Sequence, residues 1–159
     1  MQIHSIPPVY DEASEILILG SFPSVKSREQ GFFYGHPQNR FWRVLAAVYE
    51  DAIPGTVPER RAFLLRHRAA LWDVIAACEI TGSSDASIRS PEINELGPIL
   101  EAAPIRAIFV NGQTAARLYR RYAQPLTGRP AYLLPSTSPA NAAWSLERLI
   151  EAWRVIKTV

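Results

Sequence analysis

Four short runs of consecutive apolar residues lie along the chain, and each is long enough to form a strand. They span Glu15 to Leu19, about Ala70 to Ile75, Ile105 to Val110, and Ala131 to Leu134. The runs are continuous rather than alternating, which is typical of parallel strands that are covered on both faces. The pattern therefore predicts a buried parallel sheet.

Segments with helical periodicity separate these runs. A single apolar stripe predicts a helix from about Arg40, and it comprises Phe41, Val44, Leu45 and Val48. Further helices are predicted after Pro58, over Ile93 to Ala102, over Gly112 to Tyr122, and from about Leu146. Alternating strands and helices predict an α/β fold, a three-layer αβα sandwich with a central four-stranded parallel sheet. A chain of 159 residues fits one domain, residues 1–159.

The composition narrows the class of protein. Apolar residues make up 48% of the chain and charged residues 20%, as in an ordinary globular protein. The apolar runs are shorter than the roughly 20 residues that a membrane span requires, and no signal peptide is apparent. The single cysteine, Cys78, excludes an internal disulfide and a multi-cysteine metal site, and we interpret it as a packing residue. We therefore expect a cytoplasmic protein without a membrane contact.

Positive charge is carried almost entirely by arginine, with lysine only at Lys26 and Lys157. Two clusters stand out, one at Arg60, Arg61, Arg66 and Arg68, the other at Arg117, Arg120, Arg121 and Arg129. The planar guanidinium group suits phosphate oxygens, so these clusters are candidates for a nucleic-acid contact. Solvated helix faces with partial glutamate pairing are the alternative.

The expected fold predicts where a site would lie. In open α/β sheets, ligands bind beyond the carboxyl ends of the strands. The segments at those ends are Gly20 to Ser24, Asp73 onward, Asn111-Gly112, and Pro135 to Asn141. All of them carry polar or turn-forming residues, so we expect any site at this edge of the sheet.

Several residues in these loops have two interpretations each. The aromatic run Phe32 to Tyr34 either packs into the core or stacks on a flat base. Asn39 either caps the following helix or holds a water molecule, and His36 is either a general base or structural. Asp73 is either a buried hydrogen-bond acceptor or a group that reads a base edge. We interpret Asp85 as a turn residue.

The loop from Pro135 to Asn141 is short and rich in hydroxyl groups. Such a loop can contact a phosphate backbone through side chains and main-chain N–H groups. The alternative is a helix N-cap joined to a turn.

The order of these segments resembles the uracil-DNA glycosylase superfamily over nearly the whole chain. The string from Gly35 to Trp42 contains His-Pro-Gln-Asn-Arg-Phe-Trp and is similar to a signature of the mismatch-specific uracil glycosylases. Two loops depart from that pattern. Phe22 stands where those relatives carry a water-positioning asparagine, and Ser136 to Asn141 replaces their Asn-Pro-Ser-Gly-Leu-Ser. With Leu71 to Val74 and Gly82 to Asp85, the chain looks most like the hypoxanthine-DNA glycosylase branch.

This resemblance implies a DNA-repair enzyme that flips a deaminated base out of DNA and hydrolyses its N-glycosidic bond without a cofactor or metal. Asn39 would be the catalytic residue, and His36 would assist it. The residues implied in base binding are Ser21, Phe22, Tyr34, Asp73 and Ser136. Tyr34 would stack on the base, Asp73 would accept a hydrogen bond from its edge, and backbone N–H groups near Ser21, Phe22 and Ser136 would stabilise the leaving base.

The loop residues implied in contacting the DNA minor groove are Ser138, Pro139 and Asn141. The expected partner is double-stranded DNA with a hypoxanthine, or alternatively a uracil or xanthine. Single-stranded DNA stays an open alternative, and we expect a monomer. A uracil-preferring enzyme and a non-catalytic DNA-damage-binding protein remain alternatives, the latter because of Phe22. A nucleoside hydrolase is disfavoured, because no calcium-binding aspartate cluster is present.

Overall fold

A central parallel sheet organises the computed structural model, which describes residues 1–159. Its four strands lie in the order β3-β2-β6-β7, and every neighbouring pair is parallel. The strands are β2 (Ile16–Gly20), β3 (Ala69–Asp73), β6 (Ala107–Asn111) and β7 (Ala131–Leu134). The four-stranded parallel sheet predicted from the apolar runs is therefore confirmed.

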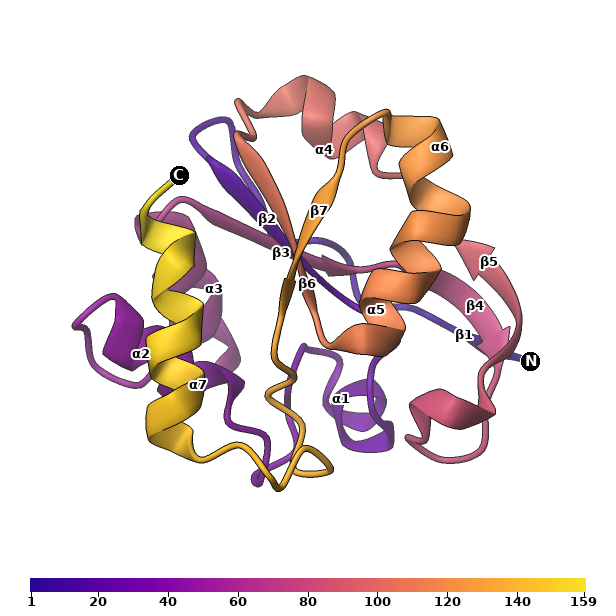
Figure 1. The fold of residues 1–159 in the computed structure, drawn as a ribbon, viewed down its shortest axis with the longest axis horizontal. Coiled ribbons are helices and arrows are strands. Elements are labelled where there is room, and N and C mark those ends of the chain that lie inside the picture. The colour runs from indigo at the N-terminus through magenta and orange to yellow at the C-terminus, as the bar shows by residue number, and fades with distance from the viewer.

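Helices cover both faces of this sheet, so the molecule has three layers (Figure 1). One layer holds α2 (Phe41–Val48), α3 (Val57–Arg66) and α7 (Leu146–Trp153), and the other holds α4 (Gly97–Ala102), α5 (Gln113–Leu118) and α6 (Gln124–Thr127). Successive residues of β2 point to opposite layers. Ile16 and Ile18 pack in the core under the first layer, and Leu17 and Leu19 pack in the core under the second.

A second, antiparallel sheet was not predicted. It consists of β1 (Gln2–Ile3), β4 (Ile75–Glu79) and β5 (Arg89–Ile93), in the order β1-β4-β5. The strand predicted to run to Ile75 instead ends at Asp73, and the chain enters β4 two residues later. The helix predicted from Ile93 was wrong at its start, because Ile93 ends β5 and α4 begins only at Gly97.

Shorter helical segments complete the chain. Helix α1 (Val25–Gln30) follows β2 and is capped by Ser24, whose side chain accepts a hydrogen bond from the Ser27 backbone N–H. The 3₁₀ turns are η1 (Asp85–Ser87) and η3 (Arg154–Lys157). The helix predicted from Gly112 to Tyr122 begins as α5 and continues as a π-helical turn, η2 (Tyr119–Ala123). None of the helices has the length and apolarity needed to cross a bilayer.

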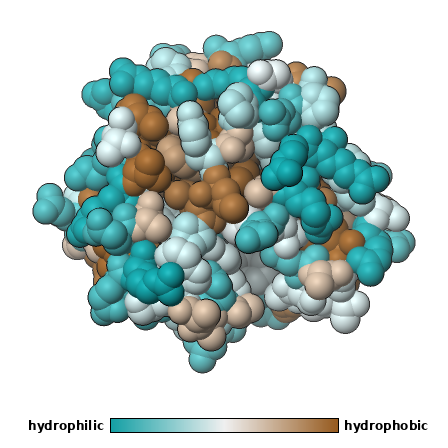
Figure 2. Space-filling view, in the orientation of Figure 1, coloured by the Kyte–Doolittle hydropathy of each residue, from teal (hydrophilic) through white to brown (hydrophobic).

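The surface shows where apolar and basic groups lie. Figure 2 shows apolar residues in the middle of one face, over the edge strand β7, where Leu133 is half exposed. The first arginine cluster lies on and beside α3. Arg60 stacks over Trp42, and Arg61 over Phe32, with 5.2 and 5.3 Å from guanidinium carbon to ring centre. Arg66 pairs with Asp51. These contacts cover the aromatic core.

Candidate active site

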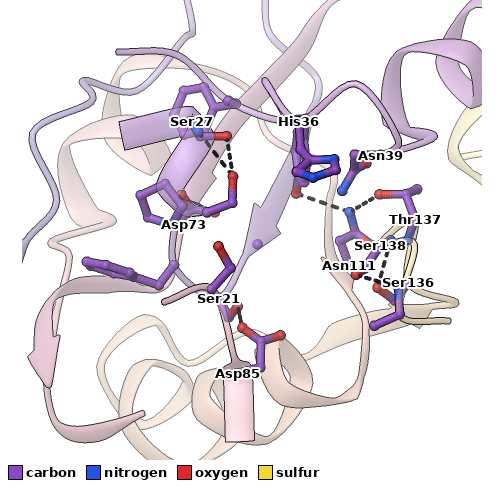
Figure 3. A pocket seen from close by; sticks show the side chains of 18 of the residues that line it. Ser21, Ser27, His36, Asn39, Asp73, Asp85, Asn111, Ser136, Thr137 and Ser138 are labelled. Atoms are coloured by element: carbon purple, nitrogen blue, oxygen red, sulfur yellow. Dashed lines mark hydrogen bonds between the residues drawn. The ribbon is translucent and has the colours of Figure 1, made fainter. Parts of the chain in front are cut away.

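A polar cavity of about 350 Å³ opens at the carboxyl ends of the parallel strands, at the edge predicted from the sequence (Figure 3). Nine of the ten proposed site residues line it: Ser21, Phe22, Tyr34, His36, Asn39, Asp73, Ser136, Ser138 and Pro139. The tenth, Asn141, lies in an adjoining groove that shares Ser136 and Ser138 with the cavity. Segments from four strand ends therefore meet at one place.

One side of the cavity presents neutral amide and hydroxyl groups, and we call Asn39, Asn111 and Thr137 the amide side. The Asn111 side-chain nitrogen donates to the Tyr34 hydroxyl at 3.1 Å and to the Thr137 hydroxyl at 3.0 Å. Its side-chain oxygen accepts from the Thr137 backbone N–H at 3.1 Å. These three bonds fix the orientation of the Asn111 amide. Sequence reasoning noted Asn111 only as a strand end.

Asn39 lies two residues before α2, whose N-cap residue is Arg40, so it is not the N-cap itself, although its side chain bonds the first N–H of the helix. Its Oδ1 accepts a hydrogen bond from the Phe41 backbone N–H at 3.0 Å. The side chain points toward the middle of the pocket in Figure 3. One lone pair on Oδ1 and the whole NH₂ group have no protein partner, so both are available to a ligand or a water molecule.

His36 lies on the exposed rim of the cavity, next to Asn39. Its Nδ1 accepts a hydrogen bond from the Gln38 backbone N–H at 3.1 Å. A backbone N–H can only donate, so in the neutral ring the proton is on Nε2. The free nitrogen of His36 is thus a donor, which suits contact with a carbonyl oxygen better than the general-base role.

Arg40 fastens the loop from Ser138 to Trp144 to the start of α2. Its guanidinium group donates to the carbonyl oxygens of Ser138 and Asn141, each at 3.1 Å, and to that of Trp144. The Arg40 backbone N–H also bonds the carbonyl oxygen of Thr137 at 3.1 Å. Its Nε is buried without a partner, and no carboxylate pairs with the side chain. Nothing in the sequence around Arg40 indicates this role.

The opposite side of the cavity holds both of its acidic groups, and we call Ser21, Asp73 and Asp85 the carboxylate side. The Ser21 hydroxyl donates to Asp85 Oδ1 at 2.7 Å. Reduced contact of the carboxyl with water and the nearby negative charge of Asp73 raise the pKa of Asp85, whereas Ser21 and Arg117 act against this shift. Interpreting Asp85 as only a turn residue was therefore incomplete, because it starts η1 and also lines the cavity.

Asp73 ends β3 and is 3% exposed. Its Oδ2 is bonded to His4 Nε2 at 2.8 Å, and its backbone oxygen accepts from the Asn94 side chain at 2.9 Å. A Cβ atom on Gly20 would lie 2.3 Å from Asp73 Oδ1 and 2.8 Å from the Tyr34 hydroxyl. Position 20 must therefore be glycine for these groups to converge. His4 was missed entirely, because nothing in the local sequence marks it.

The aromatic run divides between core and cavity: core packing is confirmed for Phe32 and Phe33, and stacking on a base stays a prediction for Tyr34. Phe32 and Phe33 are 1% and 2% exposed, and both Phe33 and Tyr34 line the cavity. The Tyr34 ring stacks on Phe41 with 4.0 Å between centres. Burial and the nearby Asp73 charge raise the pKa of Tyr34, so its hydroxyl stays neutral. Its backbone is left-handed, with φ of 53°.

Phe22, in the loop after β2, lines the cavity and is largely buried. The residue is 8% exposed, and its ring meets that of His4 edge-on. A phenyl ring has no polar atom with which to hold a water molecule. Three residues that line the cavity have a backbone N–H without an acceptor in the protein, namely Ser21, Phe22 and Ser136. No three His, Cys, Asp or Glu side chains gather closely enough to hold a metal ion.

Comparison with known proteins gives a consistent result. A family model described as the uracil DNA glycosylase superfamily matches residues 7–157. A protein from Methanosarcina acetivorans named hypoxanthine DNA glycosylase is 37% identical, with 94% of both chains covered. One of the same name from Methanosarcina barkeri is 36% identical, with 89% of both covered. An NMR structure from Methanosarcina acetivorans, described as a uracil DNA glycosylase, superposes with a TM-score of 0.79 at 33% identity over 96% of each chain.

Proposed function

This chain belongs to the uracil-DNA glycosylase superfamily, and from that premise we propose that it is a monofunctional DNA glycosylase that removes hypoxanthine from DNA. The observation that carries this proposal is the cavity in which Asn39, Asp73 and the loop at Ser136 converge. Its volume of about 350 Å³ suits one nucleobase, which must leave the duplex stack to reach it. Relatives at 36–37% identity named for hypoxanthine favour that base.

The leaving base departs as an anion. As the bond between C1′ of the deoxyribose and the base nitrogen breaks, its electron pair moves onto the base and spreads to the carbonyl oxygen. Donors around that oxygen lower the barrier, because they stabilise charge that develops only in the transition state. The unengaged backbone N–H groups of Ser21, Phe22 and Ser136 can supply them, together with Nε2–H of His36.

Asn39 positions the second reactant, a water molecule whose oxygen bonds to C1′ as the base leaves. Asn39 Oδ1 accepts a hydrogen bond from the Phe41 N–H, and its second lone pair can accept one from an O–H of the water. In this proposal the water-positioning group is Asn39, just before α2. It takes the role that an asparagine at the position of Phe22 has in the mismatch-specific relatives. The proton released by the water finally joins the departed base, so that the products are free hypoxanthine and an abasic site.

The loop between Ser138 and Trp144 is proposed to meet the DNA. Pro139 is exposed at the cavity mouth, whereas the Ser138 and Asn141 backbones are fixed by Arg40. The Asn141 side chain donates to the Ser136 carbonyl oxygen at 3.0 Å, so it shapes the loop as well. A rigid wedge of this kind suits the gap left by a flipped nucleotide in the minor groove. We propose that a monomer, with residues 1–159 as one domain, acts on duplex DNA.

The proposal is tested with labelled duplexes that contain deoxyinosine, deoxyuridine or deoxyxanthosine, each opposite every normal base. After incubation, alkali cleaves the strand at abasic sites, so cleavage reports glycosylase activity. We expect deoxyinosine duplexes to be cleaved fastest, and duplexes faster than single strands. Absence of cleavage for all three lesions at enzyme excess would refute a glycosylase, and faster cleavage of deoxyuridine would refute the hypoxanthine preference.

A further inference from the structure

His4 is buried directly behind the cavity although it lies near one end of the chain. Its side chain has 0% exposure, and its ring lies among those of Phe22, Phe33 and Trp72, with centroid distances of 6.0, 6.0 and 6.3 Å. The His4 backbone N–H bonds the Ala76 carbonyl oxygen at 2.6 Å, which attaches this segment to β4. A polar ring in such surroundings requires a partner for each nitrogen.

The hydrogen bonds of His4 determine which of its nitrogens carries the proton. The Ile6 backbone N–H donates to Nδ1 at 3.2 Å, so Nδ1 must be the acceptor. The proton of the neutral ring is then on Nε2, and Nε2–H donates to Asp73 Oδ2 at 2.8 Å. The ring thus presents a donor to Asp73 in one fixed direction.

The second oxygen of Asp73 is left for a ligand. Oδ1 receives no hydrogen bond from the protein. It is also not fully enclosed, because Arg40 Nε is the only fully buried side-chain N or O atom without a partner. It lies over Gly20 on the cavity floor, since a Cβ atom there would almost touch it. At the other end of the residue, Asn94 holds the Asp73 backbone oxygen. Asp73 therefore offers the cavity one acceptor in a set position.

An acceptor of this kind distinguishes a deaminated base from its parent, hypoxanthine from adenine and uracil from cytosine. Deamination of adenine turns an amino group into a carbonyl and places a hydrogen on the neighbouring ring nitrogen. That nitrogen changes from an acceptor in adenine to a donor in hypoxanthine, and cytosine changes in the same way when it becomes uracil. A carboxylate oxygen opposite the ring nitrogen bonds the deaminated base and faces a lone pair in its parent base, adenine or cytosine.

This selection requires that the carboxylate cannot turn. A rotated Asp73 would accept equally well from the amino group of adenine. We infer that His4 is a positioning residue, which sets the preference for hypoxanthine over adenine by holding Asp73 in the orientation that reads a ring N–H. The inference rests on the proposed function in that it takes a flipped base as the ligand of this cavity.

The test measures binding, so that it does not depend on cleavage. The duplexes carry the 2′-fluoroarabino analogue of deoxyinosine or of deoxyadenosine, because the fluorine makes loss of the base very slow. Each analogue is placed opposite a tetrahydrofuran abasic site, which removes the difference in base-pairing cost. The quantity compared is the ratio of the two dissociation constants for wild type, His4→Phe and His4→Gln.

We expect wild type to favour the hypoxanthine duplex by about tenfold or more, the value of one well-placed hydrogen bond to a charged group. His4→Phe keeps an aromatic ring without the donor, and its ratio should fall close to one while affinity for undamaged duplex stays unchanged. His4→Gln retains an N–H donor and should recover a ratio within about threefold of wild type. A ratio unchanged in His4→Phe would overturn the inference.

His67→Phe is the matched control, because His67 makes the same kind of bond to Asp51, 2.7 Å long, away from the cavity. It should lower thermal stability without moving the ratio. If His4→Phe does not fold, the inference is tested on wild type by NMR, through the Nε2–H resonance of His4 in the presence of each duplex. It should shift with the hypoxanthine duplex and not with the adenine duplex, and equal behaviour would overturn the inference. Preference without cleavage would refute the hydrolase and leave the inference standing.

Discussion

The amide side and the carboxylate side of the cavity are built in different ways. On the amide side, Asn39 accepts from the Phe41 backbone N–H, and Asn111 bonds Tyr34 and Thr137. The nearby Arg40 guanidinium bonds only carbonyl oxygens. On the carboxylate side, Asp73 and Asp85 are held by side chains, those of His4 and Ser21. Neutral groups lie opposite charged ones across the space proposed for the base.

In the mechanism that we propose, this difference separates the parts of the reaction between the two sides. A buried carboxylate is a strong, selective acceptor, and it suits recognition of a base edge. The proposed water near the sugar needs a rigid partner, and the hydrogen bond between Asn39 Oδ1 and the Phe41 backbone N–H would supply that rigidity. We therefore expect changes on the amide side to lower the rate of cleavage, and changes on the carboxylate side to alter selectivity and pH dependence.

Removing the Asn39 amide should have the largest effect. We expect Asn39→Ala to lower the single-turnover rate of deoxyinosine cleavage by about 10²–10³-fold, the range for one positioned catalytic group. Loss of its hydrogen bond to the Phe41 N–H would also lower the free energy of unfolding by about 1 kcal/mol. Asn39→Ser keeps a side-chain oxygen for that N–H but cannot reach the water. If Asn39→Ser is as active as wild type, the water is held elsewhere.

Arg40→Met should release the loop from Ser138 to Trp144. Three charge-assisted bonds to carbonyl oxygens are lost, and we expect the free energy of unfolding to fall by about 2–3 kcal/mol. Urea denaturation measures this change, and fluorescence anisotropy measures the accompanying loss of duplex affinity. Arg43→Met, on the exposed face of the same helix, is the control and should change neither. Equal effects in both variants would mean that Arg40 does not hold the loop.

Gly20→Ala tests whether the two sides must converge. The new Cβ atom would displace Asp73 Oδ1 and the Tyr34 hydroxyl, so we expect a loss of about 1–3 kcal/mol in stability and a clear loss of deoxyinosine cleavage. Gly55→Ala meets no atom within 4 Å and should be neutral or slightly stabilising. Unchanged activity in Gly20→Ala would show that the convergence over Gly20 is not needed.

Asp85→Asn should have the smallest effect, on pH-dependent stability. A raised pKa means that the folded protein binds the proton more tightly than the unfolded chain, so Asp85 weakens folding as pH rises through that pKa. The asparagine variant should therefore be more stable than wild type at pH 7, by no more than about 0.5 kcal/mol because the group is partly exposed.

The gap between Asp85→Asn and wild type should close below about pH 3.8, the ordinary pKa of an aspartate, where both states are protonated. Asp51→Asn is the control with the opposite sign, because Arg66 and His67 hold the pKa of Asp51 well below its usual range. That variant should be less stable than wild type at pH 7. Urea midpoints at pH 7 and pH 3.5 measure both, and a loss of stability in Asp85→Asn at pH 7 would contradict the assignment.

The central sheet could be predicted because its strands are buried on both faces. The run at β2 is apolar at every position, and the stripe of α2 repeats with helical spacing, so local pattern and tertiary position agree. The second sheet gave no such signal. Strand β5 reads Arg-Ser-Pro-Glu-Ile and is largely exposed, and β1 has only two residues, so only pairing with β4 makes them strands.

The same limit applied to the site. Residues directly after apolar strands, such as Asp73 and Ser136, could be predicted because parallel strands end at one edge. His4, Asp85 and the role of Arg40 could not, because each depends on a segment at least 60 residues away in the sequence. The proton position on His4 follows from a single backbone contact that no spacing rule contains.

Strand β1 pairs with β4 through two residues, Gln2 with Cys78 and Ile3 with Ala77, and the His4 backbone N–H adds one bond to Ala76. A segment with so few bonds separates from a fold at a lower free energy than the core does. His4 follows it directly, so fraying of β1 would weaken the hydrogen bond between His4 and Asp73 while the parallel sheet stays intact. On warming, the enzyme should therefore become less discriminating before it melts, and its fidelity should have a lower temperature limit than its stability.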